Sequence, residues 1–309
     1  MKYIDMHCDT ASKLLDENKF LLDNDFSIDI NKLIKGHSMA QFFAFFIDMK
    51  NTENPFDRIL KMKDVLFEEI SKNKDRLSLA TDYNSLIKNQ DKNKISCFLT
   101  LEEGGAINGD INNLDILYDL GLRLITLTWN YENQIGYPHN IEYYKDKGLK
   151  PFGKDLIEIM NHYKMIIDVS HLSDKGFYDV AKLSKFPFVA SHSNSRFIQN
   201  HSRNLSDEMI KTLANSGGVM GLNFCSSFLG NNPVSTIDDM KNHLMHIRNK
   251  GGIDVICLGT DFDGIENQVE IKDASEMDKL YLALKGTFNE DEIEKIFYKN
   301  AIRLIKDVL

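Results

Sequence analysis

The sequence predicts an α/β protein that folds as a single (β/α)8 TIM barrel over residues 1–309. Two observations support this prediction. Eight short apolar runs are spread along the chain, and most are separated by stretches with apolar residues at helical spacing. No linker rich in Gly, Ser or Pro divides the chain, which contains only 5 prolines. Unbroken alternation of strand and helix is typical of a parallel barrel, and 309 residues are enough to form one.

The eight runs have the composition of strands that are buried on both faces of a parallel sheet, because they are rich in β-branched and aromatic residues. They are YIDMHCD (3–9), MAQFFAFFID (39–48), ISCFLTLEEGG (95–105), LRLITLTWN (122–130), MIIDVSH (165–171), FPFVASH (186–192), GVMGLNF (218–224) and VICLGTDFDG (255–264). A doubly wound open sheet is the alternative architecture. Its usual signal, GxGxxG after the first strand, is absent.

Helices are predicted between most of these runs. The stretches are 59–72, 114–121, 155–163, 174–183, 206–218, 240–250 and the last twenty residues. Ser173 and Ser206 are predicted N-caps of two of them. Residues 50–55 and 131–152 are predicted loops, and the second is long enough to suggest a functional role.

Composition excludes several classes of protein. The net charge is -9, with acidic and basic residues mixed along the chain, so a nucleic-acid partner is not expected. Cysteines at 8, 97, 225 and 257 are far apart and lie in apolar segments, which predicts buried free thiols in a reducing cytoplasm. The first residues do not resemble a secretory leader, and no apolar stretch is long enough to span a membrane. We therefore expect a cytoplasmic protein without a membrane partner.

Five of the apolar runs end in residues that bind metals well. These residues are His7 and Asp9, the pair Glu102–Glu103, His171, His192, and Asp261 with Asp263. Closing a barrel brings the carboxyl ends of its strands together, and chemistry in such barrels takes place at that end. Residues two apart in a strand share a face, so we expect His7 and Asp9 to point inward. By the same alternation, Ile4, Met6 and Cys8 should face the helices.

Taken singly, each of these residues has an ordinary explanation as a cap, a turn residue or a solvated charge. Their shared position at the ends of successive strands favours a common site. Three His, one Asp and one Glu exceed the ligands of one open zinc ion, which suggests two metals sharing a carboxylate. Imidazole and carboxylate favour Zn, with Mn, Co and Fe as alternatives. A hydroxide held between two metals would attack a polarised carbonyl, so metal-assisted hydrolysis is the predicted chemistry.

At this point the chain resembles a known family, the membrane dipeptidases, also called renal dipeptidases or M19 peptidases, within the metal-dependent amidohydrolases. The matching segments run in order along the chain: DMHCDT (5–10), EEGGA (102–106), ITLTWN (125–130), GLKPFGK (148–154), IIDVSHLS (166–173), ASHSNSR (190–196), SRNLSDE (202–208) and GTDFDG (259–264). The resemblance implies a soluble bacterial member of the family, with two zinc ions per chain, that cleaves dipeptides.

The resemblance also implies roles for single residues. His7 and Asp9 would ligate one zinc, and His171 and His192 the other. Glu103, directly before Gly104–Gly105, would bridge them. Arg203 would bind the free carboxylate of the substrate, and Asp261 would orient its amino group or transfer a proton. Asp263 would hold a turn.

The chain departs from the family pattern at Trp129, where many members have a histidine thought to steady the tetrahedral intermediate. Either the metals are sufficient for that task, or His139 in the following loop takes it over. The family also implies tolerance of D-residues, so L,D-dipeptides are expected among the substrates. Two alternative functions remain: another binuclear amidohydrolase, such as a deaminase or lactonase, and a metal-binding protein without turnover. A homodimer is the expected assembly.

Overall fold

The computed structural model describes all 309 residues and confirms the predicted barrel. The strands are β1 (Tyr3–Cys8), β2 (Ser38–Phe46), β3 (Leu77–Leu79), β4 (Ile95–Glu102), β5 (Leu122–Thr126), β6 (Ile166–Asp168), β7 (Val189–Ala190), β8 (Val219–Leu222) and β9 (Ile256–Leu258). Every neighbouring pair is parallel, and pairing of β2 with β4 closes eight strands into a ring. All eight predicted runs contain one of these strands. The short β3 was not predicted, and it pairs with the beginning of β4.

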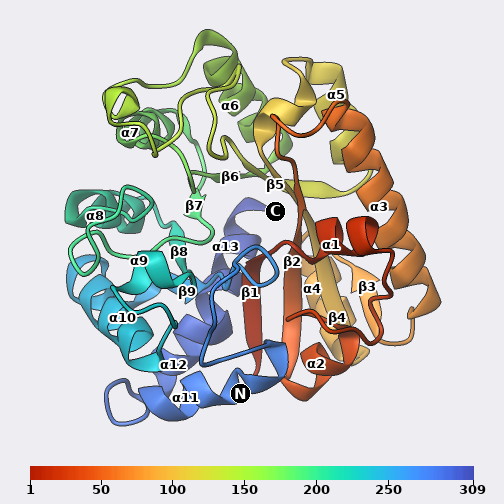
Figure 1. The fold of residues 1–309 in the computed structure, drawn as a ribbon, viewed down its shortest axis with the longest axis vertical. Coiled ribbons are helices and arrows are strands. Elements are labelled where there is room, and N and C mark those ends of the chain that lie inside the picture. The colour runs from red at the N-terminus through yellow and green to blue at the C-terminus, as the bar shows by residue number, and fades with distance from the viewer.

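Helices surround the strands (Figure 1). They are α1 (Thr10–Glu17), α2 (Ile30–Lys35), α3 (Pro55–Lys72), α4 (Tyr83–Asp91), α5 (Ile111–Asp119), α6 (Pro151–Tyr163), α7 (Asp174–Leu183), α8 (Asp207–Asn215), α9 (Ser226–Leu229), α10 (Ile237–Gly251), α11 (Asp278–Leu284), α12 (Glu290–Glu294) and α13 (Asn300–Val308). The two predicted caps are confirmed. Ser173 Oγ accepts a hydrogen bond from Gly176 N, and Ser206 Oγ accepts one from Met209 N. No helix is both long enough and apolar enough to cross a lipid bilayer.

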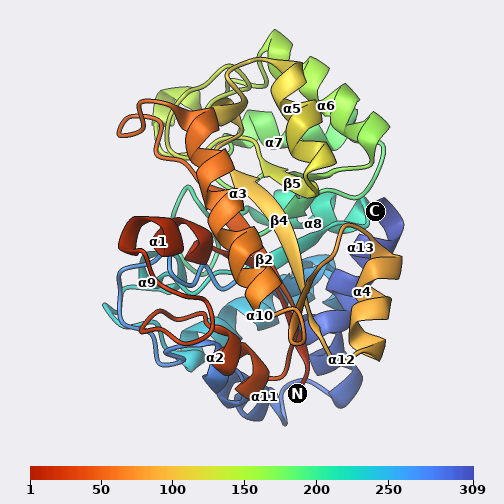
Figure 2. The ribbon, with the colours of Figure 1, turned by 90° about the vertical axis from the view of Figure 1, so that its right-hand side faces the viewer.

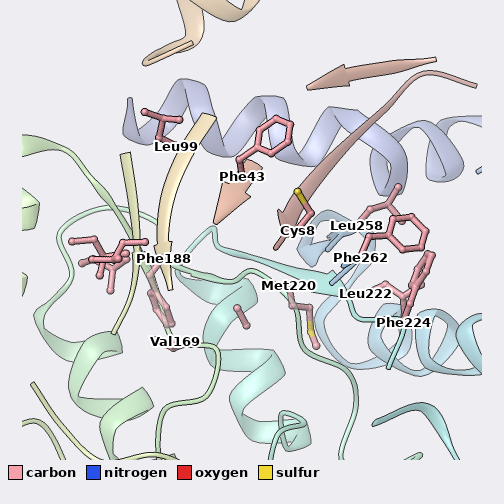
Figure 3. Packing of buried hydrophobic residues seen from close by; sticks show 14 of the residues in the cluster. Cys8, Phe43, Leu99, Val169, Phe188, Met220, Leu222, Phe224, Leu258 and Phe262 are labelled. Carbon is pink, nitrogen blue, oxygen red and sulfur yellow. The ribbon is translucent and has the colours of Figure 1, made fainter. Parts of the chain in front are cut away.

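The larger hydrophobic core lies between the strands and the surrounding helices. It contains 65 buried residues, including outward-facing side chains of the strands such as Phe43, Leu99 and Met220. Figure 3 shows these three together with Leu222, Leu258 and other members of the cluster. This layer fixes each strand against its helix, so the positions of the strand ends are set by packing.

A second core of 17 buried residues fills the inside of the barrel. It takes side chains from eight different strands, and Phe42 stacks on Phe98 across it with ring centroids 4.6 Å apart. Ile4 and Met6 belong to this inner cluster, so the prediction that they face the helices was wrong. The pairing of β1 with β2 is irregular between Asp5 and Cys8, and strict alternation therefore does not hold along β1.

The helix α13 closes one end of the barrel. Its Leu304, Ile305 and Val308 belong to the inner cluster and are buried. Figure 2 shows α13 and α4 at one end of the barrel and α1 and α9 at the other. The carboxyl ends of the strands open toward α1, which follows β1 directly. One end is thus sealed by apolar side chains, and the other carries polar ones.

Candidate metal centre and active site

Six polar side chains meet at the carboxyl ends of the strands. They are His7 in β1, Asp9 directly after β1, Glu102 at the end of β4, His171 after β6, His192 after β7 and Asp261 after β9. The structure thus brings together four of the five predicted metal ligands. Backbone φ is +67° at His171 and +63° at Asp261, in the left-handed region that costs such residues about 1–3 kcal/mol. Strain of this kind is typical of functional sites.

Glu102 lies at the centre of the group. Its Oε2 is 3.3 Å from His7 Nε2, while its Oε1 is 3.1 Å from His171 Nε2 and 3.4 Å from His192 Nε2. The same nitrogen of His7 lies 3.5 Å from Asp9 Oδ2 and 3.8 Å from Asp261 Oδ1. Each oxygen of Glu102 therefore faces a different set of donors. A carboxylate that bridges two cations has this arrangement.

The prediction that Glu103 is the bridging ligand was wrong. Its backbone φ of +85° turns it away from the other donors, and its carboxylate accepts hydrogen bonds from Gly105 N at 2.8 Å, Trp129 N at 2.9 Å and Asn133 Nδ2. Burial raises the pKa of Glu103 to about 7, and these three hydrogen bonds limit the rise. Glu103 therefore holds the loop after β4 to the loop after β5. Its neighbour Glu102, the other member of the predicted pair, takes the central position among the histidines.

The six side chains at the strand ends form a cluster of metal-ligand atoms, the donor cluster, which fits divalent metal ions. Both ring nitrogens of His7 and Oδ1 of Asp9 are buried and have no hydrogen-bond partner, which is rare for buried polar atoms. Burial and the negative charge of Glu102 raise the pKa of Asp9 to about 8. Negative charge is thus crowded around Asp9, and a bound cation would offset it. Imidazole nitrogens and carboxylate oxygens are the ligands that zinc prefers when sulfur is absent.

A chain of hydrogen bonds fixes the orientation of the His192 ring. Its Nδ1 lies 2.7 Å from Ser191 Oγ, which in turn donates to Asp168. Asp168 also accepts from Thr126 Oγ1 at 2.6 Å and from two backbone N–H groups. A proton held on Nδ1 leaves Nε2 free as a ligand, and metal-binding histidines are usually oriented in this way. The alternation Ile166–Asp168 within β6 was the sequence signal that could have identified Asp168.

Arg203 is a buried cation without a full set of partners. Its side chain donates from Nη1 to Ser193 Oγ at 2.7 Å, whereas Nε and Nη2 have no partner. Burial lowers the pKa of Arg203, and the charges of Asp261 and Glu102 counteract that effect. A buried guanidinium needs an anion, and its fork matches a carboxylate in bidentate geometry. Two of the three guanidinium nitrogens of Arg203, Nε and Nη2, are thus left without a partner.

The two aspartates after β9 differ in their surroundings. Asp261 accepts from Asn223 Nδ2 at 2.9 Å, and burial raises its pKa to about 6. Asp263 accepts from Thr10 Oγ1 at 2.6 Å and from Ser27 N at 2.7 Å. Asp263 therefore ties the loop after β9 to two other segments, which confirms the structural role expected for it. Asp261 remains available to the site.

A cleft of about 640 Å³ opens over these residues. Its wall includes Trp129, which packs edge-on against Phe46 with ring centroids 4.8 Å apart. Cys225 also lines the cleft and is half-buried, whereas the other three cysteines are buried as predicted. The volume suits a small ligand that reaches Glu102 and His171 at its base.

Comparison with known proteins agrees with this geometry. The family model described as membrane dipeptidase, peptidase family M19, matches residues 1–309. An uncharacterized protein in the pqqA 5′ region of Klebsiella pneumoniae is 30% identical over 82% of this chain and 97% of its own length. The crystal structure of dipeptidase AC, a metallopeptidase of family M19, has a TM-score of 0.92, 26% identity, and coverage of 100% of this chain and 98% of that one.

A metallopeptidase from Rhodobacter sphaeroides has the same fold. Its structure was solved with a phosphinate mimic of the dipeptide L-Ala-D-Ala, and it has a TM-score of 0.92, 24% identity, and coverage of 100% of this chain and 99% of that one. The match of the family model spans the whole barrel and every residue of the donor cluster. The chain is a metal-dependent dipeptidase that belongs to the membrane dipeptidase family, peptidase family M19.

Proposed function

We propose that the 309 residues form one catalytic domain that hydrolyses dipeptides with two zinc ions. Asp9 and His7 would hold one ion and His171 and His192 the other, with Glu102 between them. When bound, the metals polarise the scissile carbonyl and lower the pKa of a water nucleophile. The opposed contacts of the two Glu102 oxygens support two ions rather than one.

The observation that carries the substrate assignment is that Nε and Nη2 of buried Arg203 have no hydrogen-bond partner. A dipeptide places its free carboxylate a fixed distance from its single peptide bond. With that carboxylate bound to Arg203, the scissile bond of a dipeptide would lie at the donor cluster, whereas a longer peptide would place its carboxylate farther from the bond to be cleaved. Asp261 faces the same centre and would accept or deliver the proton that the leaving amine requires.

Arg203 also separates this proposal from its alternatives. A deaminase or a lactonase has no need for a buried, unpaired cation beside the metals, and a protein without turnover would not need Asp261 left free. L-Ala-D-Ala is the first substrate to test, because a fold relative binds a mimic of that dipeptide. A homodimer and a cytoplasmic location, both expected from the sequence, stay predictions.

The test compares hydrolysis of L-Ala-D-Ala and L-Ala-L-Ala with that of their C-terminal amides, a tripeptide and a lactone. We expect the free dipeptides alone to be cleaved, with activity lost on chelation and restored by zinc. Arg203→Met should lower kcat/KM for free dipeptides about 100-fold and abolish the preference over amides, since it removes hydrogen bonds to a charged group. Arg76→Met, a change at an exposed arginine, is the control. Cleavage of amides and free dipeptides at equal rates by the wild type would contradict the proposal.

A further inference from the structure

Asn130, in the long loop after β5, lines the cleft together with Glu102 and His171. Its side-chain oxygen is shared by two histidines: Oδ1 lies 3.1 Å from His171 Nδ1 and 3.3 Å from His139 Nε2. The side-chain hydrogen bonds of Asn130 all involve Oδ1 and none involves the side-chain nitrogen, while the backbone oxygen accepts one from Asn140 at 3.1 Å. One end of the amide is therefore doubly held, and the other end is free.

The directions of these hydrogen bonds follow from the chemistry of His171. Its Nε2 faces Glu102 and is the candidate ligand, so it must offer a lone pair and the proton must sit on Nδ1. The partner of that N–H must be an acceptor, which identifies the amide oxygen of Asn130. His139 Nε2 meets the same oxygen and must also donate. Its Nδ1 is then an acceptor, and Ser202 Oγ lies 2.8 Å away to donate to it.

His139 is fixed in place by the loop 131–152. Its backbone N donates to the backbone oxygen of His171 at 2.8 Å, and Pro138 pairs with Leu172 beside it. The loop therefore carries His139 to the side of Asn130 that faces away from the free amide nitrogen. Because an amide group is planar, two donors on the oxygen also fix the direction of the nitrogen.

We propose that Asn130 is a catalytic residue whose side-chain N–H donates to the scissile carbonyl oxygen of the bound dipeptide, with His139 and Ser202 as its positioning residues. The inference rests on the proposed function and adds a substrate contact to it. A neutral donor held rigidly before the reaction stabilises the negative charge that develops on the carbonyl oxygen. The same amide oxygen keeps His171 in the tautomer that binds metal. The function of the loop 131–152 is then to hold His139 against Asn130.

Asn130→Asp removes the N–H donor of this side chain and keeps its acceptor oxygen. An aspartate has the same shape and still accepts from both histidines, but it has no N–H to give. We expect metal content to stay at the wild-type level while kcat for L-Ala-D-Ala falls about 100-fold, the loss typical when one such donor is removed. Binding of a phosphinate mimic of L-Ala-D-Ala, whose phosphinate oxygens take the place of the charged carbonyl oxygen, should weaken in parallel.

Asn130→Leu tests the positioning of His171. It removes the acceptor as well as the donor, so we expect one of two metal equivalents to be lost on dialysis against a chelator, in addition to the loss of kcat. Metal retained in full by Asn130→Leu would overturn the positioning role. A kcat for Asn130→Asp within about threefold of wild type would overturn the donor role.

Asn200→Asp provides a matched control for added negative charge. Asn200 is exposed, lines the small pocket that also contains His139 and Ser202, and makes no side-chain hydrogen bond. We expect wild-type kcat and metal content from it, and a loss equal to that of Asn130→Asp would overturn the proposal. If the wild type cleaves dipeptides and Asn130→Asp does so equally well, the inference alone fails. If the wild type cleaves none, the proposed function fails first.

Discussion

Glu102 and Glu103 have identical side chains and adjacent positions, yet the backbone gives them different roles. Glu102 is the last residue of β4 and continues the inward face of Phe98 and Thr100. Glu103 has left the strand with a positive φ and accepts hydrogen bonds from the neighbouring loop. Glu102 therefore lies in the candidate metal centre, and Glu103 holds the loops around it.

Exchanging each glutamate for glutamine should separate these roles. Glu102→Gln should lose bound metal and nearly all activity, because a neutral amide cannot bridge two cations. Glu103→Gln should retain metal but lower the free energy of unfolding by about 1–3 kcal/mol, since an NH2 group then meets backbone N–H donors. Metal analysis and urea unfolding of the two variants test this. The reverse outcome, with metal lost only from Glu103→Gln, would show that the ligand assignment is mistaken.

Four members of the candidate metal centre, His7, Asp9, His171 and His192, were predictable from the sequence because they share a position at the ends of successive apolar strands. The choice between Glu102 and Glu103 depended on which face of β4 points inward, and Leu99 and Phe98 are equally apolar. The sequence also gave no sign that His243 is buried. Its Nδ1 accepts a hydrogen bond from Ser195 N, its Nε2 donates one to Leu229 O, and burial lowers its pKa to about 4. Such contacts join residues far apart in the chain.

The loop after β9 packs closely against the candidate metal centre at Gly264. A Cβ atom at this position would lie 2.0 Å from Asp9 Oδ2 and 2.7 Å from Asp261 Oδ1. The backbone of the loop therefore occupies the space directly behind two carboxylates of the site. Only glycine allows that approach.

Gly264→Ala should displace Asp9 and Asp261 and so weaken metal binding. We expect at least a tenfold rise in the zinc dissociation constant, about 1.4 kcal/mol, from a change of one methyl group outside the donor set. Zinc titration by calorimetry measures it. Gly230→Ala is the control, because its nearest neighbour would be 3.6 Å away. Equal zinc affinity in the two variants would argue against this account of Gly264.

The eight barrel strands were predictable because each is apolar on both faces, whereas several other elements were not. β3 has three residues and only one of them is buried. α1 begins immediately after Asp9 without a side-chain cap, so no sequence signal separates it from β1. α9 has four residues. Short elements such as these are defined by their contacts with the barrel rather than by their own periodicity.

At the scale of the whole molecule, the barrel collects negative charge at one end. Carboxylate oxygens of Asp9, Glu102 and Asp261 all lie within 3.8 Å of His7 Nε2, and burial raises the pKa of Asp261 to about 6. Bound divalent ions would relieve this repulsion. The stability of the fold should therefore depend on metal.

Removal of metal with a chelator should lower the melting temperature, and zinc should restore it. One ion at a free concentration 1,000 times its dissociation constant stabilises the native state by about 4 kcal/mol. Calorimetry with and without chelator measures the difference, and Glu102→Gln, which lacks the bridge, should show a smaller response. A melting temperature unaffected by chelation would count against metals within this cluster.

The seal formed by α13 has a consequence for biosynthesis. Ile4 and Met6 share one apolar cluster with Leu304 and Val308, which are synthesised much later. Contacts between such distant parts of a chain form slowly, and partly made barrels expose unpaired strand edges. The interior of the barrel therefore cannot be completed until Val308 has been synthesised, and until then the apolar side chains of the first strands lack their partners.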